Sequence, residues 1–293
     1  MKEAFKSQRI SGDRQLLIGH ANTILESYAA EGYRLTLRQL YYQLVARNII
    51  PNRVQEYAKL SNVMVAARMC GHTDWDFLED RLRIPYREYA VHNVQEALED
   101  TISQYKRFRQ EGQPYCIEVW TEKDAVSNIL KRVTEWFHVN LMVNRGYSSC
   151  SAMYRAAERF KQFEESVNVK ILYVGDHDPS GLDMLRDIRE RLYEFDTANF
   201  EVVHVALTYD QIQEFHPPPN PAKTTDPRST GYIAEHGENS WELDALSPRD
   251  LERIVREAVE EFLDKEQFGA IVEEERDDIA QLEKVVNDLG DIK

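Results

Sequence analysis

Short strand-type runs alternate with helix-type segments from residue 115 onward, and this alternation constrains the fold more than any other feature of the chain. The apolar, β-branched runs that we expect to be strands are residues 115–120, 139–143, 169–174 and 200–206. The segments with helical spacing between them are residues 125–137, 151–163 and 182–193. Alternation of this kind predicts an α/β fold, in which helices cover both faces of a mainly parallel sheet.

The first 112 residues show a different pattern, because helical spacing dominates there. We expect three short helices at 14–30, from Thr36 to Val45, and at 54–69, with Thr36 as the N-cap of the second. Residues 74–78 follow as a candidate β wing, and residues 87–110 are expected to form a longer connecting helix. This order suits a winged-helix-like, DNA-binding domain.

Three regions follow from these patterns. Residues 1–112 are the winged-helix-like domain with its connecting helix, and residues 113–210 are the α/β domain. Residues 211–293 form a partly helical C-terminal extension, whose apolar positions from Ser247 onward have helical spacing. A turn-forming Gly112-Gln-Pro114 marks the first boundary.

Acidic residues follow two of the predicted strands at the point where each strand ends. Asp176 and Asp178 come after residues 169–174, and Glu122 comes after residues 115–120. Ligands of parallel sheets bind at the carboxyl ends of strands. A Glu and two Asp gathered there would offer the hard oxygen ligands that suit Mg²⁺, so the pattern points to phosphate chemistry.

Each of these residues also has a simpler interpretation. The Asp176–Gly181 stretch could be a solvated turn, and residues 122–124 could only cap the following helix. Glu122 could instead act as a general acid or base. Lys123 and Arg145, which also follow strands, are candidate contacts to a phosphate backbone.

Charge and cysteine content limit the partners and the cell compartment that we expect for the protein. The net charge is −15, but Lys and Arg outnumber Asp and Glu within residues 1–110, and the acidic excess lies beyond them. This distribution permits nucleic-acid binding without predicting it. Three separated cysteines, no apolar signal segment and no bilayer-length apolar run lead us to expect a cytoplasmic protein without a membrane partner. A nucleoid-associated protein and one borne by a phage or mobile element both fit this expectation.

The acidic motifs resemble the Toprim domain of topoisomerases, primases and related nucleases. The matching residues are Glu122 within Val119–Ala125 and the Asp176/Asp178 pair within Val174–Gly181. That resemblance implies a Toprim domain in which Glu122, Asp176 and Asp178 hold Mg²⁺.

The resemblance extends to the A subunit of type IIB topoisomerase (topoisomerase VI) and to the meiotic double-strand-break protein. Residues 36–42, Thr-Leu-Arg-Gln-Leu-Tyr-Tyr, are similar to the tyrosine motif of that family, and Asn144–Ser149 to its Gly-aromatic stretch. The matches cover residues 30–210, whereas residues 217–226 and 241–246 look like features of bacterial and phage-borne relatives. The family order of a winged-helix domain followed by Toprim is also the order expected here.

The resemblance implies that Tyr42 attacks a DNA phosphodiester and forms a 5′-phosphotyrosyl link. Arg38 lies on the same helix face, four residues earlier, and is placed to clamp the scissile phosphate. The family mechanism places the tyrosine of one subunit against the metal site of another, which implies a homodimer whose two sites cut the two strands. It also implies a separate ATPase subunit, since this chain has no GxxxxGK[ST] run.

Two other functions remain open at this point. A Toprim nuclease would hydrolyse DNA or RNA with metal-activated water and leave Tyr42 as a core residue of a helix-turn-helix. A non-catalytic DNA-binding subunit would bind with a steep salt dependence and not cleave. The clustered carboxylates argue against the latter, because they repel phosphate.

Overall fold

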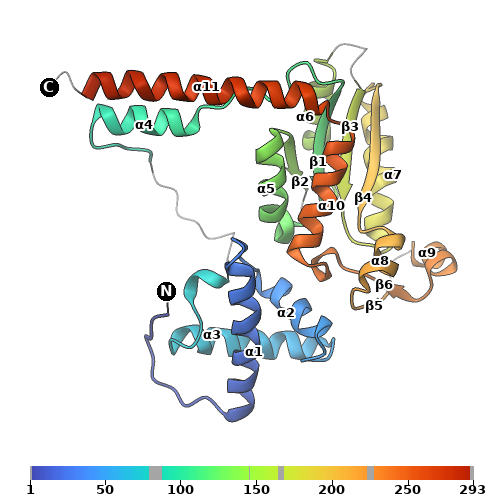
Figure 1. The fold of residues 1–293 in the computed structure, drawn as a ribbon. Coiled ribbons are helices and arrows are strands. Elements are labelled where there is room, and N and C mark those ends of the chain that lie inside the picture. The colour runs from blue at the N-terminus through green and yellow to red at the C-terminus, as the bar shows by residue number, and fades with distance from the viewer. Residues whose placement is uncertain (1, 79–87, 145, 164–167, 223–227, 291–293) are drawn as a thin grey trace.

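The computed structural model describes residues 2–78, 88–144, 146–163, 168–222 and 228–290, with the side chains of the last three left out. It has a mixed α/β architecture with a four-stranded parallel sheet among helices, which confirms the predicted class at that level. A helical N-terminal part lies beside the part that holds the sheet (Figure 1).

The N-terminal part is built from α1 (Gly12–Ala29), α2 (Leu37–Ala46) and α3 (Val54–Met69), close to the predicted ranges. Thr36 begins α2 as expected: its hydroxyl accepts the Gln39 N–H, and the Gln39 side chain accepts the Thr36 N–H in return. The apolar faces of the three helices share one buried core.

The segment expected to be a β wing differs from the prediction. Trp75–Phe77 is a short 3-10 helix, η1, and Leu78 forms a single parallel bridge with Leu35. Asp74 caps this turn through the N–H of Asp76, which favours the helical turn over an extended strand.

The long helix predicted for residues 87–110 is also shorter than expected. Helix α4 spans only Val94–Gln104. Asn93 starts it by accepting the N–H of Glu96, and Tyr105 has extended backbone that ends it. The periodic apolar residues outside these limits belong to non-helical chain where they are described.

The sheet contains β1 (Tyr115–Thr121), β2 (Asn140–Val143), β3 (Asn168–Val174) and β4 (Phe200–Ala206), in the order β2-β1-β3-β4 with every pair parallel. The chain leaves β1 toward β2 and then crosses to β3 on the other side of β1. This reversal makes the carboxyl ends of β1 and β3 the place where ligands of such sheets bind.

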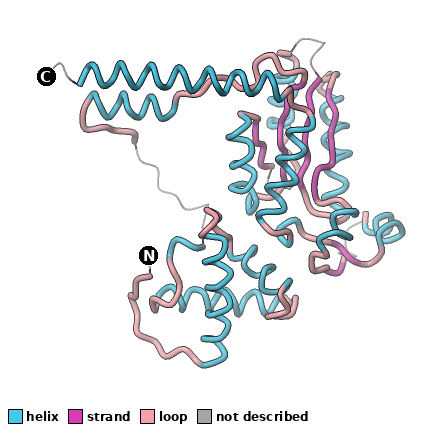
Figure 2. Tube along the Cα trace, viewed as in Figure 1, coloured by secondary structure: helices cyan, strands magenta, loops and turns pink. Residues whose placement is uncertain are grey.

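Helices cover both faces of the sheet, as Figures 1 and 2 show. Helices α5 (Ser127–Phe137) and α10 (Pro248–Glu261) share one core with the face of Ile117 and Val119. Helices α6 (Cys150–Phe160) and α7 (Pro179–Glu194) share another with the face of Trp120 and Ile171. The alternation of side chains along each strand therefore fills two separate cores.

After β4 the chain returns past the carboxyl edge of the sheet toward the N-terminal part. The elements of this return are α8 (Tyr209–Phe215), β5 (Asn220–Pro221), α9 (Ser229–His236), β6 (Asn239–Ser240) and the 3-10 helix η3 (Leu243–Ala245). η3 packs on α2, and Ala245 joins the core of the helical part.

The last helix, α11 (Lys265–Gly290), runs beside α4 and extends away from the sheet (Figure 1). Buried Arg109 anchors the base of this arm by an ion pair with Glu275, with 2.7 Å between Nη2 and Oε1. Among the helices of the described chain, none combines the length and the apolar character needed to cross a bilayer.

Candidate active site at the carboxyl ends of β1 and β3

The loop that carries Asp176 and Asp178 is held from both sides. Asp178 is the N-cap of α7 and accepts the N–H of Gly181 at 2.7 Å and the Ser180 hydroxyl at 2.9 Å. The backbone of His177 exchanges two hydrogen bonds with that of Trp241, at 2.9 and 3.0 Å. Asp176 is only 7% exposed, so the interpretation of this stretch as a solvated turn does not hold for it.

Gly181 is required where α7 begins, because the backbone of Asp176 approaches it closely. A Cβ at this position would lie 2.1 Å from the carbonyl oxygen of Asp176. The glycine in the sequence motif therefore sets how near Asp176 can lie to the helix N-terminus.

Glu122 lies just after β1 and faces the β3 loop. Burial raises the pKa of its carboxyl, the charge of Asp178 raises it further, and a hydrogen bond from the Asp176 N–H partly opposes this. The structure thus brings together Glu122 and the loop of Asp176 and Asp178, as their places at strand ends predicted. Asp124 begins the short 3-10 helix η2 (Asp124–Val126), in keeping with the helix-start interpretation of this residue.

The side chain of Asp176 is directed at Lys123. Its Oδ1 lies 2.7 Å from Lys123 Nζ and also accepts the N–H of Leu243 at 2.7 Å. Burial raises the pKa of Asp176 above its usual range even though the lysine opposes this shift. Lys123, predicted as a phosphate contact, is therefore engaged by a carboxylate in this structure.

Two further carboxylates, Glu242 and Asp244, complete a charged network around Lys123. The Lys123 ammonium contacts Glu242 and lies 3.2 Å from Asp244 Oδ2. Burial alone would raise the pKa of Glu242, but the charges of Lys123 and Arg38 outweigh it and lower that pKa. Sequence reasoning missed both acids, although they alternate with apolar residues in the 241–246 stretch that it singled out.

Arg38 joins the same network from the helical part. Its Nη2 lies 2.8 Å from Glu242 Oε1, and its Nε lies 3.0 Å from Asp244 Oδ2. The guanidinium also lies 5.9 Å from the centre of the Tyr42 ring, which confirms that the two residues share a helix face.

Tyr42 is buried, and its hydroxyl accepts a hydrogen bond from Asn220 Nδ2 at 3.1 Å. Burial raises the pKa of this phenol, and the charge of Glu242 adds to the effect. The neighbouring Tyr41 is buried as expected, but its hydroxyl donates to Asn52 Oδ1 and accepts the N–H of Arg53. Both tyrosines thus lie in the core, and Tyr42 hydrogen-bonds to Asn220 of the returning chain.

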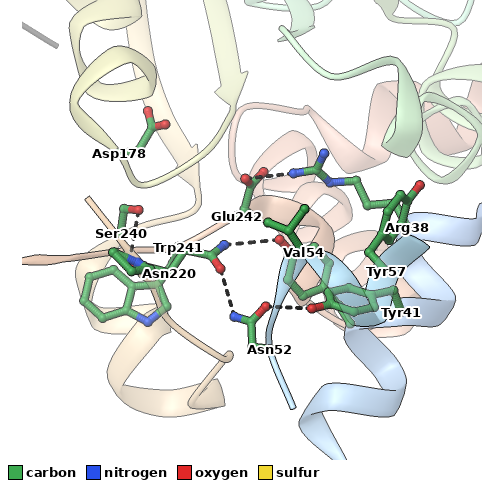
Figure 3. A pocket seen from close by; sticks show the side chains of 12 residues that line it. Arg38, Tyr41, Asn52, Val54, Tyr57, Asp178, Asn220, Ser240, Trp241 and Glu242 are labelled. Atoms are coloured by element: carbon green, nitrogen blue, oxygen red, sulfur yellow. Dashed lines mark hydrogen bonds and ion pairs between the residues drawn. The ribbon is translucent and has the colours of Figure 1, made fainter. Parts of the chain in front are cut away.

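A cavity of about 330 Å³ connects the tyrosine to the acidic loop. Tyr42 lines it, together with Asp178, Arg38 and Glu242. Figure 3 shows the last three around the cavity. The helical part and the carboxyl edge of the sheet of one chain therefore form a single site.

No protein-family model matches this chain, and no curated protein matches it. The chemistry assigned to this cavity consequently rests on the residues and on their geometry.

The carboxylate oxygens near Asp178 are of the type that binds hard cations. They are not arranged as a complete metal site in this structure. Within the described ranges, no three His, Cys, Asp or Glu side chains are arranged to hold a metal ion. Glu122 and Asp178 offer carboxylate oxygens of the kind that Mg²⁺ takes, whereas Asp176 is bonded to Lys123. Arg145, the other predicted phosphate contact, lies outside the described residues.

Proposed function

We propose that this chain cleaves DNA through Tyr42, in a Mg²⁺-dependent reaction like that of the type IIB topoisomerase A subunit. The observation that carries the proposal is the shared cavity, in which the tyrosine that matches the family motif meets Asp178 of the acidic motif. In this proposal the helical part is a winged-helix DNA-binding domain, and the sheet with its helices is a Toprim domain.

The tyrosine performs the covalent step. The Tyr42 oxygen bonds to phosphorus as the P–O3′ bond breaks, which leaves a 5′-phosphotyrosyl link and a 3′-hydroxyl. The phenol proton passes to a base and the departing O3′ takes up a proton. Glu122 suits this exchange, because its raised pKa brings it nearer to neutrality than an ordinary carboxyl.

Arg38 and Lys123 act on the phosphate in this proposal. Both cations are bonded to Glu242 and Asp244, so a DNA phosphate has to replace carboxylate partners of the same charge. Once Arg38 leaves these carboxylates, it can offer the phosphate two parallel hydrogen bonds. Arg145 remains a proposed DNA contact.

Asp178 would hold Mg²⁺, with Asp176 able to join once Lys123 turns to the phosphate. Glu122 would join them only if another group, and not Glu122, carries out the proton exchange. A bound Mg²⁺ supplies positive charge that stabilises the charge developing on the phosphate oxygens. A homodimer that cuts both strands and a separate ATPase subunit complete the proposal, and both come from the family resemblance.

Trapping of covalent adducts tests this function. We expect wild type with DNA and Mg²⁺ to yield protein attached to 5′ ends after rapid denaturation. Tyr42→Phe should yield none, and Tyr41→Phe serves as the matched control that keeps forming adducts. Adducts formed at the wild-type level by Tyr42→Phe contradict the proposal.

A second candidate is a Toprim nuclease that uses activated water. The burial of Tyr42 and its raised pKa favour this alternative, because both make the phenol a poor nucleophile in this conformation. It predicts free ends, normal cutting by Tyr42→Phe, and loss of cutting in Asp178→Asn.

A further inference from the structure

The cavity beside Tyr42 extends well beyond the groups that would react. In Figure 3, Asp178, Glu242 and Arg38 lie along one side, whereas Trp241, Asn52 and Tyr41 lie on the other. Its volume of about 330 Å³ is at the lower end of the range of small-molecule pockets, about 300 to 1,000 Å³. A small ligand in this space would meet charged groups on one side and aromatic rings and amides on the other.

One aromatic ring that lines the cavity is partly exposed to solvent and is not part of the buried core. Tyr57 on α3 is 37% exposed and lines the cavity. The edge-to-face packing of its ring on Tyr41, with 5.4 Å between centres, holds it in place. Val54, one turn earlier on α3, is 85% exposed and also lines the cavity.

The amide groups between the aromatic walls are already paired with one another. Asn52 Nδ2 donates to Asn220 Oδ1 at 2.8 Å and to the Pro219 carbonyl at 2.9 Å, and Asn52 Oδ1 accepts the Tyr41 hydroxyl. These amides support the wall and leave little capacity to read the edge of a ligand. Recognition at this end therefore depends on stacking and on shape.

We propose that the exposed ring of Tyr57, on the α3 side of the cavity, stacks on one unstacked nucleobase of the bound strand. The inference rests on the proposed function, since the phosphate of that nucleotide would lie toward Arg38, beside Tyr42. Stacking on a tyrosine tolerates every base, because each has a π face. The pocket thus selects a distorted or single-stranded nucleotide without selecting a sequence.

Fluorescence of 2-aminopurine tests the pocket without any cleavage. Oligonucleotides with this base at successive positions, single-stranded or in a one-base bulge, are titrated with protein in the absence of divalent ions, and binding is followed in parallel by anisotropy. We expect the fluorescence to be quenched when 2-aminopurine stands at one particular position of the oligonucleotide. Tyr57→Ala should abolish that quenching and weaken binding about tenfold, the usual effect of removing one stacking partner.

Two controls make the result specific. Tyr57→Phe keeps the ring and should retain quenching and affinity. Tyr154→Ala removes a half-exposed tyrosine on α6 that does not line the cavity, and it should bind as wild type does. Thermal unfolding of Tyr57→Ala near the wild-type temperature shows that the fold persists.

The possible results distinguish a failure of the nucleobase pocket from a failure of the proposed cleavage through Tyr42. DNA binding that Tyr57→Ala leaves unchanged, or binding without quenching at any position, overturns the pocket while tyrosine cleavage stands. Tyr57-dependent quenching in a wild-type chain that forms no Tyr42 adduct supports the pocket and overturns the cleavage. No binding to any oligonucleotide overturns both.

Discussion

A single carboxylate oxygen, Asp244 Oδ2, lies 3.0 Å from Arg38 Nε and 3.2 Å from Lys123 Nζ. The arginine belongs to the helical part and the lysine to the loop after β1, so one buried acid joins both parts of the site. Asp244 Oδ1 has no hydrogen-bond partner among the described residues, so the acid depends on the two cations.

Replacing this acid should destabilise the protein. Asp244→Asn leaves two partly buried cations with one fewer counter-charge, and we expect a loss of about 3 kcal/mol in the free energy of unfolding. Urea titration measures it. Glu257→Gln breaks an exposed pair with Arg253 and should change stability by less than about 0.5 kcal/mol. An equal effect of the two substitutions argues against the joining role of Asp244.

Alanine substitutions at two glycines should change the stability of the protein in opposite directions. Gly181→Ala would drive a methyl group into the Asp176 carbonyl, so we expect a loss of about 2 kcal/mol and fewer adducts as the acidic loop shifts. Gly269→Ala lies within α11 with open space around it and should stabilise by up to about 1 kcal/mol. Urea midpoints of both variants check this, and a neutral Gly181→Ala would show that the loop tolerates displacement.

Acid should weaken the fold through His204 on β4. Burial lowers the pKa of this imidazole from 6.5 to about 4, and the charge of Arg189 adds to the effect. The folded state therefore resists protonation, so its stability is full above pH 6.5 and falls as the pH drops toward 4, by about 3 kcal/mol. His204→Gln should flatten that part of the stability profile.

The control for this prediction is His20→Gln, which changes an exposed histidine on α1. Its profile between pH 6.5 and 4 should follow that of wild type. A His204→Gln profile that also follows wild type would mean that other groups cause the acid loss.

Mixing of chains tests where the tyrosine acts. Tyr42 and Asp178 line one cavity of one chain, so each chain should contain a complete site, and any dimer would pair two such sites. A refolded mixture of Tyr42→Phe and Asp178→Asn should therefore form no adducts, whereas wild type diluted with Tyr42→Phe keeps activity in proportion. Adducts from the doubly defective mixture would place the tyrosine of one chain in the site of another.

The sequence alone predicted the features that depend on local pattern. Apolar alternation specified four strands and their helices, and the parallel order then placed Glu122, Asp176 and Asp178 at one edge of the sheet. Thr36 was likewise predicted as the N-cap of α2, and the structure confirms it. Local pattern did not predict the length of the connecting helix. The apolar spacing continues beyond α4, but the helix begins at the Asn93 cap and ends where Tyr105 has extended backbone.

Only the tertiary structure decided the partners of the charged groups. The return of residues 239–246 past the sheet edge brings Glu242 and Asp244 to Arg38 and Lys123, which are far away in sequence. No local rule sets such pairs, since a carboxylate carries no information about which distant cation will meet it. Side-chain periodicity fixes strands and helices, whereas the burial and long-range contacts of the folded chain fix the charge of the site.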